Sequence, residues 1–297
     1  MMIRQNFLNQ FTASALPVLE QVIFEGYEQV QDLVPTFLNM RKMDRDIIQS
    51  STISGLPVAP QNAEGQALEY DDIVQGYSKT YTALKYRQGA KITKEMIEDG
   101  KYIQMAELAM ELGKSMQETR QIVAASILNN AFTAGASAGP DGVALASASH
   151  PLIGGLLGDN TDTADLAVAS LRAGIEAMRD TRNLQGLRRP FKAKKLVVTI
   201  TDQWLAGELL QSFLKPGVST NDVNTLPNLE VVVNDYLTDA DSWFLLADKH
   251  DLNFFERTAV ELDQKVDFDG DALKIQCRER FAVGFNDWRG FFGGLGS

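Results

Sequence analysis

The stretch "GYSKTYTALKYRQGAKITKEMIEDG", residues 76–100, changes its pattern halfway along. Its first half is rich in Tyr and Thr, which favours a β-strand. Both alternating faces of that strand would carry polar or charged side chains, whereas a strand that buries one face alternates cleanly between apolar and polar residues. We therefore predict a strand that is exposed to water on both faces in the isolated chain.

The second half of the stretch leads into a long predicted helix. From Lys101 to Phe132 this helix would be about 48 Å long at about 1.5 Å per residue, nearly three times the average helix of about twelve residues. We expect Gly100 to separate a first turn from the main helix and Gly113 to be tolerated within it. The predicted inward stripe has steps of three or four residues and consists of Leu108, Leu112, Met116, Thr119, Val123 and Ile127.

The chain before this stretch is predicted to be an arm followed by an exposed extension. Residues 17–30 favour a short amphipathic helix that starts at Pro17. Residues 50–76 are rich in Ser, Gly, Pro, Gln and Asn and contain the acidic run "EYDD" at 69–72. We interpret 50–76 as exposed, and we interpret the small-residue stretch 133–160 as loop or extended chain.

The chain after residue 160 is predicted to alternate between helices and strands. A helix over 165–182, a strand over 194–200 and a helix capped by Thr201 and stopped by Pro216 and Gly217 follow one another. The first of these helices would turn inward Ala167, Leu171, Ile175 and Met178. Four strands then follow, the last after an Asp269-Gly270 turn: "LEVVV", "SWFLLA", "LNFFER" and "ALKIQCRERFAVGF". The expected fold class is α+β.

Composition narrows the classes of function. Of the 297 residues, 44% are hydrophobic and 23% are charged, as in an ordinary globular protein. The net charge is −11. An acidic balance disfavours tight gripping of DNA, because that affinity comes from neutralising phosphates. No apolar run is long enough for a membrane helix, no secretory signal is evident, and Cys277 stands alone, so synthesis in a reducing cytoplasm is expected.

The short motifs in the sequence favour no catalytic, metal or cofactor site. The Asp-rich "VDFDGDALK" lacks the glycine and the final glutamate of a calcium loop, and a hairpin turn explains it. "GGLLG" at 154–158 is explained as a flexible loop, and the chain has only His150 and His250 to support histidine chemistry. An enzyme that uses 133–160 as a lid stays as the alternative from another class.

One basic cluster lies at residues 179–195, "RDTRNLQGLRRPFKAKK". Three interpretations remain open: a solvated surface loop, a surface that pairs with an acidic region of a neighbouring copy, and a contact with phosphates. Two interpretations also remain open for the strand at 76–87: a surface hairpin, and an edge strand that lies over a neighbouring subunit.

The order of these parts resembles the tailed-phage major capsid protein of the Hong Kong 97 type, and most closely the Mu-type major head subunit. The resembling stretches span residues 50–292 and include "ITKEMIEDG", "HPLIGG", "KLVVTITDQWLAGELLQS", "NTLPNLEVVVNDYLTDADSWFLLAD" and "RERFAVGFNDWRGFF". The resemblance implies five parts. They are an N-terminal arm (1–50), an E-loop with a strand into the spine (51–92), a P-domain with the spine helix (93–200), a mixed α/β A-domain (201–280) and a C-terminal strand and tail (281–297).

The resemblance also implies a function and a set of partners. The chain would be a non-enzymatic head protein that forms hexamers and pentamers of an icosahedral shell around double-stranded DNA, with an encapsulin-like nanocompartment shell as the alternative. Expected partners are a separate scaffolding protein, a portal and decoration proteins. We expect no cofactor, no membrane and no covalent cross-link, DNA contact by proximity only, and a place in the virion after synthesis in the bacterial cytoplasm.

The expected contacts between subunits involve the acidic run at 69–72, the water-exposed strand predicted at 76–87 and the basic cluster at 179–195. The candidate residues are Glu69, Asp71, Asp72, Tyr77, Lys79, Tyr81, Lys85, Arg87, Arg182, Arg188, Arg189 and Lys192.

Overall fold

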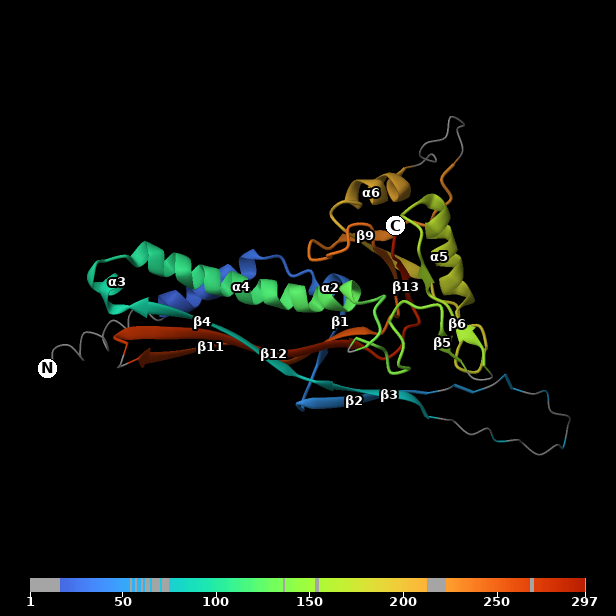
Figure 1. Cartoon of the computed structure of the whole chain (residues 1–297), viewed down its shortest axis with the longest axis horizontal. Coiled ribbons are helices and arrows are strands. Elements are labelled where there is room, and N and C mark those ends of the chain that lie inside the picture. Colours follow the sequence, from blue (N-terminus) through green and yellow to red (C-terminus); the bar gives the residue numbers. More distant parts are fainter. Residues whose placement is uncertain are drawn as a thin grey trace.

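The computed structural model shows an elongated body with a second α/β unit at one end and a two-stranded ribbon below (Figure 1). It describes residues 17–53, 55–56, 58–59, 61, 65, 70, 75–135, 137–152, 155–212, 223–267 and 270–296. The acidic candidates Glu69, Asp71 and Asp72 lie outside the described residues, as does Asp269 of the predicted turn.

The long body consists of a four-stranded sheet with a helical layer on one face. The strand order is β1-β11-β12-β4. The helix α4 lies along the sheet, and a helix over residues 17–29 packs against it (Figure 1). The bounds are β1 Asn39–Lys42, β4 Leu84–Thr93, β11 Leu252–Asp267, β12 Ala272–Phe285, α2 Val34–Phe37, α3 Lys94–Glu98 and α4 Tyr102–Asn129.

The second unit is a five-stranded sheet covered by two helices. Its order is β7-β13-β10-β8-β9. One face, with Trp243 and Leu245, packs against the two helices, while Phe244 and Leu246 on the other face join the core under the end of α4. The bounds are β7 Thr161–Asp162, α5 Val168–Asp180, β8 Ala193–Val198, α6 Gln203–Gln211, β9 Glu230–Val233, β10 Trp243–Ala247 and β13 Phe291–Gly294; nearby lies the small pair β5 His150–Pro151 and β6 Leu157–Gly158.

The predicted single strand after Gly76 is two strands that belong to different sheets. Strand β3 (Gln75–Thr82) pairs with β2 (Ile47–Ile53) in the two-stranded ribbon, and after Ala83 the chain continues as β4, which pairs with β12. Ala83 is buried and its amide donates to the carbonyl of Asp46, so the break is fixed by the body. The predicted exposure on both faces holds only in part, because Tyr81 on β3 is buried against the body and the face of β4 that carries Ile92 packs toward α4.

The long helix is confirmed, with a different buried face. It ends at Asn129, three residues earlier than predicted, and Gly100 separates it from α3 with a positive φ of 67°. Leu112, Met116 and Ile127 are buried as expected, whereas Leu108, Thr119 and Val123 are only half-buried. The reason is that two layers cover α4, so its buried face is broader than one stripe and includes the polar Gln117, Arg120 and Gln121.

Of the other local predictions, some are confirmed and some are wrong. Strand β12 has the predicted bounds, and β11 continues ten residues past its predicted end because β12 pairs with it along its whole length. Ala167 is exposed at the start of α5 rather than inward. The predicted Thr201 cap is wrong, because Asp202 occupies that position without a side-chain cap, and α6 ends at Gln211. The predicted stop at Pro216 and Gly217 lies outside the described residues.

Two glycines let the helix over 17–29 approach α4 closely. A Cβ atom at Gly113 would lie 2.1 Å from the carbonyl oxygen of Ile23, and one at Gly26 would lie 2.3 Å from that of Met110. Both obstacles are backbone, so neither can rotate away. The glycine that weakens α4 by propensity is therefore required by packing.

We predict that Gly113→Ala lowers the free energy of unfolding of the unassembled subunit by about 1–3 kcal/mol, because overpacking outweighs the gain in helix propensity. Gly207→Ala is the matched control, since this α6 glycine has open space around its Cβ position. It should raise stability by up to about 1 kcal/mol. Urea unfolding followed by circular dichroism measures both, and equal effects of the two substitutions would contradict the close approach.

Candidate functional site

The exposed ribbon is attached to the body through Tyr81. Its ring stacks on Phe255 with centroids 5.2 Å apart, and its hydroxyl donates to the carbonyl of Phe285. A Cβ at Gly284 would overlap the Tyr81 ring, so the glycine provides the space. Burial raises the pKa of the Tyr81 hydroxyl above its ordinary value. With 5% of its surface exposed, Tyr81 serves its own chain, and it offers a neighbouring subunit almost no surface.

Lys79 also faces its own chain. Its ammonium donates to the carbonyl of Ala138 and lies 5.4 Å from the ring centroid of Phe285. Burial lowers the pKa of Lys79, and the nearby Asp141 opposes that change. On the same strand Tyr77 is 39% exposed, so it is the Tyr of this pair that is open to a partner.

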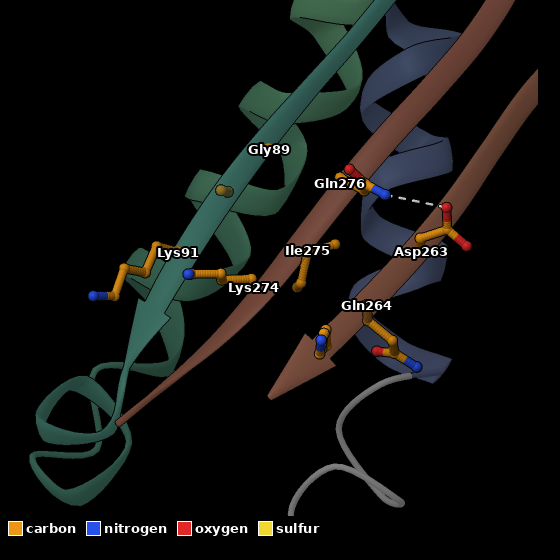
Figure 2. Close-up of a pocket in the computed structure, with 9 residues that line it drawn as sticks. Gly89, Lys91, Asp263, Gln264, Lys274, Ile275 and Gln276 are labelled. Carbon is orange, nitrogen blue, oxygen red and sulfur yellow. Dashed lines mark hydrogen bonds between the residues drawn. The ribbon is translucent and has the colours of Figure 1, made fainter. Parts of the chain in front are cut away.

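Lys85 and Arg87 lie on the open face of the long sheet. The even-numbered residues of β4 share the face of Ile92, which packs toward α4, so odd-numbered residues point away from the helix. An open depression of about 600 Å³ lies farther along this region. Figure 2 shows side chains that line it, on strands in front of the helical layer. The lining of this depression includes Gly89, Lys91, Asp263, Lys274 and Gln276.

The basic cluster at 179–195 is divided between exposed cations and ion pairs within the chain. Arg182, Arg188, Arg189 and Lys192 are all exposed. Arg188 pairs with Asp180 at 2.5 Å, on the surface, where such a pair contributes little stability. The structure therefore leaves this cluster as accessible positive charge on the second unit, beside α5.

A buried ionic cluster at Arg120 was not predicted from the sequence. Its guanidinium lies 2.7 Å from Glu279 on β12, 3.4 Å from Glu256 on β11 and 3.8 Å from Asp32. It also stacks over Phe254 at 4.6 Å. The sequence indicates only that Arg120 follows Met116 by four residues and so lies near the predicted inward face of the helix. Its partners could not be predicted, because they come from strands 136 and 159 residues away.

The carboxyl group of Glu279 has a strongly shifted pKa. Burial raises it from its ordinary 4.5 to about 7, and the attraction of Arg120 only partly offsets the rise. Within the described part of the chain the Oε2 atom of Glu279 has no hydrogen-bond partner, so the negative charge of the ionised carboxylate is poorly compensated at this oxygen. Burial, followed by the charge of Glu279, also raises the pKa of Tyr27 to about 12.

His150 and the Asp-rich stretch "VDFDGDALK", the two candidate sites raised from the sequence, have structural explanations. His150 is fully buried, stacks on Trp288 and places Nδ1 2.7 Å from Asp141, which fixes the loop that follows α4. Asp267 pairs with Lys274 at 2.6 Å. Within the described ranges no group of three metal-ligating side chains comes together, and no helix there has the length and apolar character to cross a membrane.

The same architecture occurs in solved capsid structures. A virus-like particle from Pyrococcus furiosus matches with a TM-score of 0.58 and 10% identity, over 95% of this chain and 99% of the other. The capsid of cyanophage P-SCSP1u matches with a TM-score of 0.57 and 12% identity, over 90% and 87%. The mature capsid of bacteriophage PhiM1 matches with a TM-score of 0.56 and 13% identity, over 88% and 85%. At such low identity the likeness shows the fold alone, which is the Hong Kong 97 fold of phage capsids.

The family follows from the sequence itself. A model of the phage capsid protein family matches residues 76–293, which is well over half of the chain. The chain therefore belongs to the phage capsid protein family, and it is a major capsid shell protein. A search among curated proteins finds no match.

We predict that Tyr81→Ala lowers the free energy of unfolding by about 3–5 kcal/mol, as for other large buried side chains, and increases amide exchange in β3. Tyr77→Ala removes the same side chain from a more exposed position on the same strand. It should change stability by less than about 0.5 kcal/mol. Chemical unfolding and hydrogen exchange of the unassembled subunit test this pair, and equal losses would show that Tyr81 does not anchor the ribbon.

A second prediction concerns pH. Between about pH 4.5 and 7 the unfolded chain has released the Glu279 proton that the folded chain retains, so stability falls as the pH rises through this window. At roughly 1.4 kcal/mol per pKa unit the decline amounts to a few kcal/mol. Glu279→Gln should remove this decline of stability with rising pH, whereas Glu261→Gln, at an exposed position on β11, should leave it unchanged. Unfolding free energies at several pH values decide this, and an unchanged slope in Glu279→Gln would refute it.

Proposed function

We propose that this protein is the head subunit of a tailed bacteriophage or prophage whose copies form hexamers and pentamers of an icosahedral shell around double-stranded DNA. The observation that carries the proposal is the match of residues 76–293 to the phage capsid family. The strands β3 and β4 support it, because the side chains that they leave exposed in the single chain gain cover when copies assemble.

The charge of the chain suits a container for DNA. A net charge of −11 repels phosphates at long range, so the packaged nucleic acid is held by enclosure rather than by adhesion. No enzymatic step is part of this proposal. Within the proposed shell the protein resides in the virion, and its synthesis takes place in the bacterial cytoplasm.

The proposed contacts between subunits use the exposed candidates. The candidates with exposed side chains are the ribbon residue Tyr77, the sheet residues Lys85 and Arg87, and the basic cluster with Arg182, Arg188, Arg189 and Lys192. The acidic run with Glu69, Asp71 and Asp72, which lies outside the described residues, is also proposed as a contact. A separate scaffolding protein, a portal and decoration proteins complete the proposed head. The stretches quoted above in their order support a Mu-type subunit within the family.

Electron microscopy of the purified protein beside its size-exclusion profile tests the proposal. We expect hollow polyhedral shells, tubes or separate five- and six-membered rings, alone or with a co-expressed scaffold. A compact monomer under all of these conditions would argue against the shell function. DNA rather than protein cargo inside particles from infected or induced cells would distinguish a phage head from an encapsulin-like compartment.

A further inference from the structure

The open face of the long sheet carries opposed rows of positive charge. On β4 and β12, residues directly across from each other share a face, and three such pairs are cationic: Lys85 with Arg280, Arg87 with Arg278, and Lys91 with Lys274. Like charges opposite each other destabilise a sheet. A chain with a net charge of −11 therefore concentrates cations on one face at some cost to its own stability.

Carboxylates of the same chain neutralise this face only in part. Arg278 lies 3.8 Å from Glu261, and Lys274 pairs with Asp267. Within the residues that the structure describes, no carboxylate forms an ion pair with Lys85, Arg87 or Arg280. The end of the face nearest to Ala83 is therefore positive and available to an anionic partner.

The chain itself contains a complementary segment. Residues 46–78 include no Lys or Arg and carry Asp46, Glu64, Glu69, Asp71 and Asp72. The dense part is the run at 69–72, where three of four residues are acidic. A run of carboxylates in extended chain has the chemistry to satisfy rows of cations spaced two residues apart on a sheet, about 7 Å.

The acidic run of the same copy is too far away to reach this face. It lies three to six residues before Gln75, so it stays within about 22 Å of that residue even when fully extended. Arg87 lies twelve residues after Gln75 along β3 and β4, about 40 Å at the strand rise. Figure 1 shows β3 and β4 following one another along the long axis, so the chain does not fold back to shorten this distance.

We propose that the cationic face of β4 and β12, centred on Lys85, Arg87 and Arg280, binds the acidic segment around Asp71 and Asp72 of a second copy of this chain. The proposal rests on the shell function proposed above and identifies one contact within it. It adds Arg280 and the neighbouring β12 cations to the contact. The cations that carboxylates of the same chain leave unpaired would be neutralised between subunits, so assembly is coupled to charge neutralisation.

A charge exchange tests the contact in the assembling protein. Lys85→Glu/Arg87→Glu and Asp71→Lys/Asp72→Lys should each reduce the yield of shells or rings at least tenfold, because each opposes like charges. The combined variant should restore the yield to within about threefold of wild type. Lys42→Glu/Lys249→Glu reverses two exposed cations elsewhere and should assemble normally. Thermal unfolding of the subunits verifies that every variant folds.

Two results would overturn the contact. One is normal assembly of both reversed variants; the other is failure of the combined variant to recover although it folds. A normal yield of shells with loss of bound DNA in Lys85→Glu/Arg87→Glu would also overturn it and would assign the face to phosphates. Failure of the wild-type protein to assemble counts against the shell function instead.

A peptide measurement keeps the contact testable without assembly. A synthetic peptide of residues 64–75 should bind the unassembled subunit, and its affinity should fall at least fivefold for Arg87→Glu and with added salt. The same peptide with Glu69→Gln, Asp71→Asn and Asp72→Asn is the control and should bind weakly to either subunit. Equal binding of the two peptides would contradict the proposed contact.

Discussion

Arg120 carries a positive charge at the middle of the protein with only 6% of its surface exposed, and such a charge is tolerated only when its partners are in place. Glu279 and Glu256 come from neighbouring strands of the long sheet, and Asp32 comes from the segment after the first helix. The pairs therefore fix α4 to the sheet and the N-terminal segment to both. Misplacing any one of these elements would leave a buried charge without its counterion.

This arrangement also decides which surfaces stay free. Because α4 and the helix over 17–29 occupy one face of the long sheet, the other face is covered at one end by Tyr81 of the ribbon, on Phe255 and Ala282, and displays the cations of β4 and β12 farther along. The ribbon of β2 and β3 meets the body through Tyr81 and Lys79, whereas side chains such as Ile47 and Tyr77 stay exposed. A subunit with a partly uncovered sheet face and a projecting ribbon is suited to a shell, in which neighbouring copies supply the missing contacts.

Much of the fold could be predicted from local pattern. The 3.6-residue period revealed α4, the alternation in "ALKIQCRERFAVGF" gave β12 its bounds, and Gly100 separated α3 from α4 as expected. The candidate surface was predicted in part. Lys85 and Arg87 lie exposed as expected, whereas Arg278 and Arg280 were missed, because their proximity depends on the register between β12 and β4. The sequence offered one indication of this surface, namely that cations are spaced two residues apart in both strands.

The sequence by itself determined the long helix, the polar character of the strand after Gly76, the acidic balance and the resemblance to a capsid subunit, because each depends on local spacing or on composition. Only the tertiary structure decided that this strand divides at Ala83 between two sheets, that Tyr81 anchors it, and that Arg120 meets Glu279. These outcomes depend on contacts between residues far apart in the chain. Their energies come from burial and pairing, which no single stretch of sequence contains.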